Sequence, residues 1–228
     1  MATTSDLLVD LLSRVRENVH GVLLSTPEDR LAIPPAPGTN TITWLVWHLT
    51  RVLDEQVAEV FGYPAVWEAG GWRARMALPV PPEAHGYGMA FEEVLQVRAS
   101  AEHLRGYFDA ASGAADEALR AVTDADLDRV VDENWDPPVT LAVRLVSVLD
   151  DCVQHAGQAA YASGILSRSL PGPVGQREGK LGAPGAPARH GIRSGGELHD
   201  DRGVVAGACP LALLAVDDGT DDPLGQRG

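Results

Sequence analysis

The sequence has no long hydrophobic run, few cysteines and little positive charge, and each shortage excludes a class of protein. Its 228 residues contain no uninterrupted apolar stretch of about 18 residues, the length that a membrane-spanning helix needs. The N-terminus, MATTSDLLVDLL, lacks the order of positive, apolar and small residues that marks a signal peptide. We therefore expect a soluble cytoplasmic protein that does not bind a membrane.

The scarcity of cysteines and the scarcity of basic residues have different implications. Cys152 and Cys209 are too few and too far apart for a disulfide framework, which agrees with a reducing compartment. Lysine and arginine together number 18 against 32 aspartate and glutamate residues, so the formal net charge is -14. A surface of this charge repels phosphate groups, so we expect no nucleic-acid partner.

The composition changes after Leu170, where about a third of the remaining residues are glycine or proline. This composition predicts a low-complexity, disordered tail over residues 171–228 without chemistry of its own. A regulatory or partner-binding tail is the alternative, with ACPLALLAV (208–216) as the one stretch apolar enough to dock. His190 and His199 have no neighbours at metal-ligand spacing.

Before Leu170, apolar residues recur every three or four positions, the spacing of amphipathic helices. This spacing predicts a first helix over 5–24, capped by Thr4 or Ser5, and a second over 42–62. Thr39, Asn40 or Thr41 can cap the second helix, and Gly62 is its natural end.

The following segment, 63–89, is rich in glycine, proline and aromatic residues, so we expect a long loop with short turns. Loops of that length are often functional. A third helix is expected over 89–122, weakened at Gly113, and a capped turn over 123–132. The fourth helix should begin after Asp136 or Thr140 and run to about 166. No strand or repeat is evident, so residues 1–170 predict an all-α four-helix bundle, a fold that commonly holds metals or ligands in its core.

The chemistry centres on His48, an imidazole in the apolar run WLVWHLT. Asp151 and His155 are four residues apart, about 40° around a helix, and therefore share a face, whereas Asp150 is displaced by about 140° and should face solvent. If the second helix presents His48 to that face, two imidazoles and one carboxylate make a competent site for a divalent ion. The alternatives are a hydrogen-bonded core histidine and a helical salt bridge.

The order of these motifs resembles the DinB-like family of helical bundles, in particular the branch that contains the N-terminal domain of mycothiol-dependent maleylpyruvate isomerase. The resemblance covers residues 4–168 and is carried by WLVWHLTRVLDEQVAEVFG (44–62), GW (71–72), GYG (86–88), VTDADLD (122–128) and WDPPVTLAVRLVSVLDDCVQHAGQAAYASGIL (135–166). It implies a DinB-like bundle that binds one divalent ion, zinc or nickel.

Carried onto this sequence, the resemblance implies that His48, Asp151 and His155 hold the metal. Asp151 is one methylene shorter than the glutamate of the isomerase and lacks the imidazole of three-histidine members, which weakens the ion or lets water replace the carboxylate. Gln56 and Gln158 stand where related sequences can have histidine, and neither supplies a further ligand.

Other residues have a functional interpretation and a structural one. Arg144 falls near the Asp151 and His155 stripe and could steady an anionic substrate, or it could form a salt bridge with Asp54 or Glu55. Cys152 could act with His155 as a nucleophile or be a small core residue.

Several aromatic residues and histidines also have both a functional and a structural interpretation. Four tryptophans either line a pocket or fill the core, namely Trp44, Trp47, Trp67 and Trp72. Three histidines have no partner at ligand spacing, namely His20, His85 and His103, and only His85 is placed to reach the mouth of a site.

The resemblance favours a transferase or isomerase that acts on a small molecule and activates a low-molecular-weight thiol such as mycothiol. One alternative is a non-catalytic bundle that binds a ligand or forms a homodimer through its helix faces. Another is a metal-dependent hydrolase, for which no separate general base is evident in the sequence.

Overall fold

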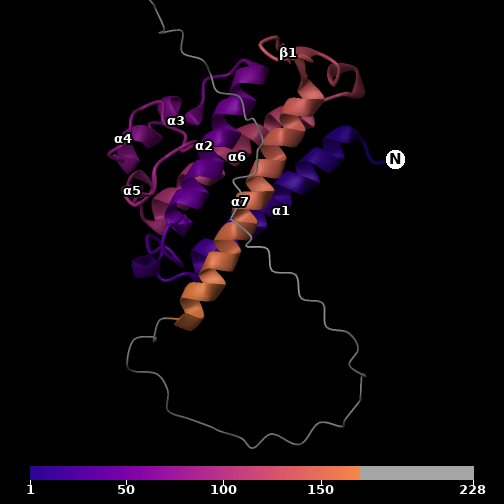
Figure 1. The fold of residues 1–228 in the computed structure, drawn as a ribbon. Coiled ribbons are helices and arrows are strands. Elements are labelled where there is room, and N and C mark those ends of the chain that lie inside the picture. The colour runs from indigo at the N-terminus through magenta and orange to yellow at the C-terminus, as the bar shows by residue number, and fades with distance from the viewer. Residues whose placement is uncertain (170–228) are drawn as a thin grey trace, which may run out of the picture. The chain divides into compact units, whose positions relative to one another are not determined.

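A computed structural model of the protein describes residues 1–169, and four long helices dominate this part (Figure 1). They are α1 (Thr4–Ser25), α2 (Ile42–Phe61), α6 (Ala101–Arg120) and α7 (Leu141–Ser169). α2 packs against α6 and α7, and α1 packs against the same two helices. The predicted all-α four-helix bundle is confirmed.

The described residues end before the predicted tail. The tail, with His190, His199 and the 208–216 stretch, lies outside the described residues. Within residues 1–169, no helix combines the length and apolarity that crossing a membrane requires.

Short elements fill the connections between the long helices. A 3-10 helix, η1 (Glu28–Arg30), follows α1, and a second, η2 (Asp124–Asp126), follows α6. The long connection after α2 contains α3 (Val66–Ala69), α4 (Trp72–Met76) and α5 (Phe91–Val94), which lie on one side of α2 (Figure 1). This connection therefore packs on the bundle instead of extending from it.

Capping residues determine where the first two long helices begin. The side chain of Thr41 accepts a hydrogen bond from the Trp44 amide at 3.1 Å, and Gly62 ends α2 in the left-handed conformation at φ 74°, both as predicted. The cap of α1 is Thr3, so the expectation of Thr4 or Ser5 is wrong. Thr3 and Asp6 bond to each other's backbone amides and form a capping box, which requires the acid three residues after the cap.

The single helix predicted over 89–122 is wrong, because α5 and α6 are separate. The side chain of Ser100 accepts a hydrogen bond from the His103 amide at 3.1 Å and starts α6 as a new helix. Val97 is fully buried between the two helices, so this segment turns into the core. α6 continues through Gly113 without a break, which corrects the expected weakening there.

A small antiparallel hairpin precedes α7, although the sequence predicted no strand. β1 (Val130–Asp132) pairs with β2 (Val139–Thr140), with Val130 opposite Thr140. Strands of two or three residues are too short to show an alternating pattern in sequence. Thr140, rather than Asp136, caps α7, because its side chain accepts from the Val143 amide at 3.4 Å.

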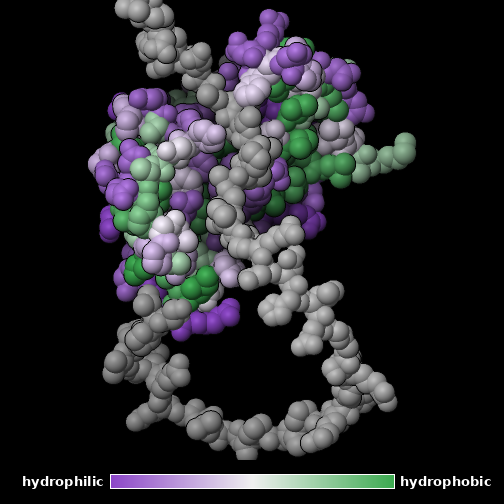
Figure 2. Space-filling model, in the orientation of Figure 1, coloured by the Kyte–Doolittle hydropathy of each residue, from purple (hydrophilic) through white to green (hydrophobic). Residues whose placement is uncertain are grey.

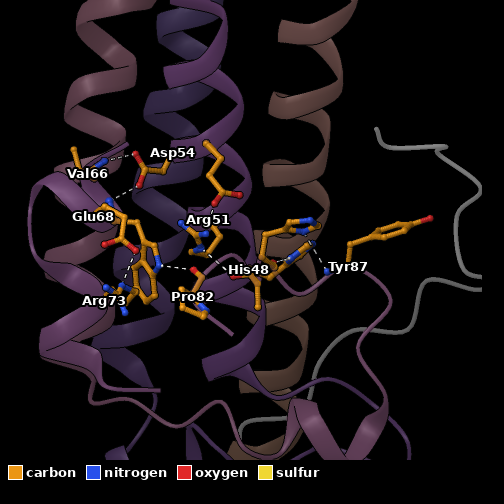
Figure 3. A network of polar contacts seen from close by, with 12 residues as sticks. His48, Arg51, Asp54, Val66, Glu68, Arg73, Pro82 and Tyr87 are labelled. Atoms are coloured by element: carbon orange, nitrogen blue, oxygen red, sulfur yellow. Dashed lines mark hydrogen bonds and ion pairs between the residues drawn. The ribbon is translucent and has the colours of Figure 1, made fainter. Parts of the chain in front are cut away.

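Asp54 joins the long connection to the bundle core (Figure 3). Its carboxylate is buried and accepts hydrogen bonds from the amides of Val66 and Trp67, at 2.9 and 2.8 Å, and from the hydroxyl of Tyr107 at 2.9 Å. One side chain of α2 thereby caps α3 and contacts α6. Because buried carboxylates are stabilised only by such donors, Asp54 fixes where the connection starts its course along α2.

We expect Asp54→Ala to lower the free energy of unfolding by about 3 kcal/mol or more, because it leaves two amides and one hydroxyl buried without their acceptor. Urea unfolding followed by circular dichroism measures the change. Asp10→Ala is the matched control, because Asp10 pairs with Arg14 on the surface and such a pair contributes less than about 1 kcal/mol. Equal losses in the two variants would contradict this role of Asp54.

Candidate metal site

The structure brings His48 of α2 together with Asp151 and His155 of α7. One ligand atom from each of the three lies within 4.8 Å of the other two. The Nε2 atom of His155 is 3.4 Å from the Oδ1 atom of Asp151, and the Nε2 atom of His48 is 4.0 Å from the same oxygen. Two ligands of one tetrahedral zinc ion lie about 3.3 Å apart, so small side-chain shifts would give this spacing.

Both imidazoles turn the same nitrogen toward the shared space. The Nδ1 atom of His48 hydrogen-bonds to the backbone carbonyl of His85, and because a carbonyl only accepts, Nδ1 carries the proton. The Nδ1 atom of His155 is 2.9 Å from the Oε1 atom of Gln158, which favours the same tautomer. Each Nε2 atom is thus left with a lone pair, the form in which imidazole binds a metal.

Asp151 supplies the oxygen of the set. Within residues 1–169, its Oδ2 atom is buried and has no hydrogen-bond partner. A buried carboxylate oxygen without a donor is costly unless a cation balances it. Two imidazole nitrogens and this carboxylate therefore fit a divalent ion by type, spacing and unmet bonding capacity.

Trp44 covers one side of the cluster, and the other side is partly exposed to solvent. The indole of Trp44 stacks on His48 with ring centroids 4.6 Å apart and meets His155 edge-on at 5.9 Å. Side-chain exposure rises from 7% at His48 to 12% at Asp151 and 17% at His155. The solvent-exposed part of the cluster is therefore on the α7 side.

The two histidines have opposite pKa shifts. Burial lowers the pKa of His48 to about 4, with a further contribution from the charge of His155, and Asp151 only partly opposes it. Burial also acts to lower the pKa of His155, but the hydrogen bond and charge of Asp151, together with Gln158, outweigh it and raise that pKa. His48 is therefore neutral at physiological pH, while a proton competes with a cation at His155 more strongly than at an ordinary histidine.

Arg144 is placed differently from the expectation. Its guanidinium is buried and contacts Gln56, Glu59 at 3.4 Å and Asp132 at 3.1 Å, so the predicted salt bridge between helices is present, but its partner on α2 is Glu59 and not Asp54 or Glu55. The difference follows from the hairpin, which the sequence did not reveal and which supplies Asp132. Seven residues separate Arg144 from Asp151, about 10 Å along α7, so its groups bond to protein away from the three ligands.

Three other polar residues of α7 have structural partners. Cys152 is fully buried, its pKa is raised well above the ordinary value by burial, and its thiol faces the Leu49 carbonyl at 3.7 Å. It is therefore a core residue, since a nucleophile needs the thiolate form. Asp150 is exposed as expected and accepts a hydrogen bond from Gln154, and Gln158 supports His155.

The remaining aromatic residues and histidines divide between core and surface. Trp47 and Trp67 are buried in the core, and Trp72 packs on Tyr107 with ring centroids 6.0 Å apart. His20 bonds to Asp109 at 2.6 Å, far along the chain from the site.

His85 reaches the site in a way the sequence did not predict. Its backbone carbonyl accepts a hydrogen bond from His48, and its imidazole accepts one from the Tyr87 amide at 3.3 Å. The next residue, Gly86, has φ 104°, a conformation that favours glycine, so a glycine beside a histidine in the long loop was the only available signal.

Comparison with known proteins shows the family and the fold of the chain. The model of the DinB superfamily matches residues 11–159, a range that includes all three predicted ligands. A crystal structure described as that of a conserved protein from Enterococcus faecalis is similar to 73% of this chain and 99% of its own chain, with 32% identity and a TM-score of 0.69. No curated protein matches the chain.

We expect the metal-free protein to lose stability as the pH falls from about 6.5 to about 4. In this window the unfolded chain protonates His48 and the folded chain does not, because the folded pKa is about 4. The stability from neutral His48 is fully present above pH 6.5, and its loss approaches about 3 kcal/mol near pH 4.

Urea unfolding in a chelating buffer, repeated across this pH range, measures the effect. His48→Gln removes the titrating group and should flatten the acid side of the profile relative to wild type. His155 has the opposite sign, because a raised pKa gives stability that is lost as the pH rises through that pKa. If the free energy of unfolding falls equally with decreasing pH in wild type and in His48→Gln, the burial of a neutral imidazole is refuted.

Proposed function

Because the chain belongs to the DinB superfamily, we propose that it is a metal-dependent enzyme in which His48, Asp151 and His155 hold one divalent ion. The observation that carries the proposal is the convergence of two Nε2 lone pairs on a buried carboxylate whose second oxygen lacks a partner within residues 1–169. Three protein ligands and a partly exposed side are typical of catalytic sites, whereas structural zinc sites are closed by four.

The reaction that we propose is thiol-dependent transfer or isomerisation of a small molecule. A zinc or nickel ion at this site would lower the pKa of a bound thiol or water. Trp44 excludes water from the inner side, and the exposed edges of Asp151 and His155 leave access for a thiol such as mycothiol. Glu55, an acid of α2 that follows His48 in the sequence, is ion-paired with Arg51, which disfavours its use as the base that hydrolysis needs.

We expect the full-length protein, made without a histidine tag, to bind close to one equivalent of zinc or nickel by elemental mass spectrometry. His48→Ala and His155→Ala should each lose most of this metal. His103→Ala is the matched control, because His103 is exposed and lies outside the cluster. Folded wild-type protein that takes up neither ion would refute the metal site.

The hypothesis that the protein uses a thiol is tested by thermal unfolding. Mycothiol should raise the melting temperature of the metal-loaded protein and leave the chelated protein unchanged, because a ligand stabilises only the form that binds it. Cleavage of simple esters or amides without thiol, lost on chelation, would indicate the hydrolase instead.

The second candidate function, a non-catalytic bundle that forms a homodimer, is favoured by the solvent face of α7. Between Val143 and Tyr161, this face exposes four large apolar side chains, namely Val143, Val146, Val153 and Tyr161, and one charged residue, Asp150. Figure 2 shows apolar side chains along the same part of the bundle. Interface centres are depleted of charge in this way, so we infer that a second copy covers the face.

We expect light scattering to give a dimer for wild type and a monomer for the Val146→Asp, Val153→Asp double variant, because two buried charges destabilise the interface. Leu24→Asp, on the exposed side of α1, is the control and should stay dimeric. A dimer without bound metal would support this function over the enzyme, and a monomeric wild type would exclude it.

A further inference from the structure

Residues 84–89 of the long connection lie along one stripe of α2. The side chains of Trp44, His48 and Arg51 fall at i, i+4 and i+7, the spacing of a single helix face. Trp44 donates to the sulfur of Met89 at 3.4 Å, His48 to the carbonyl of His85, and Arg51 to the carbonyl of Ala84 at 3.1 Å. The partners follow in reverse order, so this 84–89 segment runs antiparallel to α2.

The segment is itself anchored on the side away from the metal site (Figure 3). The guanidinium of Arg51 is buried, forms an ion pair with Glu55 and lies over the Trp67 ring at 4.7 Å. The indole nitrogen of Trp67 donates to the carbonyl of Pro82 at 3.2 Å. A cation–π contact, an ion pair and two hydrogen bonds therefore hold the backbone that meets His48.

Gly86 lets this backbone approach the imidazole. A Cβ atom at residue 86 would lie 2.7 Å from the Nδ1 atom of His48, 3.1 Å from the Trp44 ring and 3.2 Å from the Trp47 ring. Real Cβ atoms do not approach so closely, and none of the three rings can move freely, because all are packed in or beside the core. Any side chain at residue 86 would push the His85 carbonyl away from His48.

We propose that the backbone of His85 and Gly86 is the positioning element of the metal ligand His48. The His85 carbonyl keeps the proton on Nδ1, and the Gly86 backbone holds the ring so that the Nε2 lone pair faces Asp151 and His155. Without the carbonyl, the Nδ1 proton would be buried without an acceptor, and the ring would turn or move its proton to Nε2, which cannot then bind a metal. This inference rests on the proposed metal site and assigns a role to residues that are not ligands.

The first test compares zinc affinities of full-length variants by competition with a chromophoric chelator. Gly86→Ala should bind zinc about 10- to 100-fold more weakly than wild type, the usual effect of losing a group that orients a ligand. Gly88→Ala is the matched control, because Gly88 also has positive φ, at 71°, but its added Cβ would have no neighbour within 4 Å among the described residues.

The outcomes separate this inference from the proposed function. If wild type binds zinc and Gly86→Ala binds it as tightly as Gly88→Ala, the positioning role is wrong and the metal site stands. If wild type binds neither zinc nor nickel, both are wrong. A weakening confined to Gly86→Ala supports both.

A second measurement uses the wild-type protein, so its result does not depend on whether a variant folds. Two-dimensional NMR of the histidine-labelled full-length chain at neutral pH, in chelating buffer, distinguishes the two neutral tautomers of His48 by the nitrogen that carries the proton. The expected form has the proton on Nδ1, and zinc should then shift the Nε2 resonance. A proton on Nε2 in the metal-free chain would overturn the inference, whatever the Gly86 variant does.

Discussion

The hydrogen bond from His48 to the backbone of His85 connects the two parts of the molecule on which the site depends. On one side is the bundle, where α2 and α7 bring an imidazole opposite a carboxylate and a second imidazole. On the other is a loop that supplies no ligand but determines which nitrogen of His48 is free. Because imidazole has one donor and one acceptor when neutral, satisfying Nδ1 decides the chemistry of Nε2.

α2 carries an unusual number of polar side chains into the interior, and the long connection is what makes them stable. His48, Arg51 and Asp54 are all nearly fully buried, which would be costly on a helix covered only by apolar neighbours. Asp54 bonds to the start of α3, Arg51 to Ala84 and His48 to His85. The connection is therefore a structural partner of α2, and its length is needed to reach three successive polar positions along the helix.

Asp151 gives the site its electrostatic asymmetry. It lies nearer to His155 than to His48, and it raises the pKa of His155, whereas burial lowers the pKa of His48 to about 4. A proton therefore competes with a cation more strongly at His155 than at His48. Asp151 also has one methylene fewer than glutamate, yet its carboxylate oxygen reaches 3.4 Å from one histidine, so the shorter side chain spans the gap within its own helix turn.

The sequence by itself determined the features that depend on local periodicity. Helical spacing located the bundle, Thr41 and Gly62 bounded α2, and the four-residue interval placed Asp151 and His155 on one face, because these properties follow from 100° per residue and from cap chemistry. The identities of the three predicted ligands came from the same spacing together with the family resemblance. Neither the spacing nor the resemblance shows which groups of the chain lie opposite a helix face.

Tertiary structure decided the rest. The break between α5 and α6, the hairpin that supplies Asp132 to Arg144, and the His85 carbonyl beside His48 all depend on contacts between residues far apart in sequence. The last of these is a backbone group, which has no residue type to recognise, and Gly86 signals it only because a missing side chain leaves room. Periodicity and the resemblance could propose the ligands, but only packing could show how His48 is held.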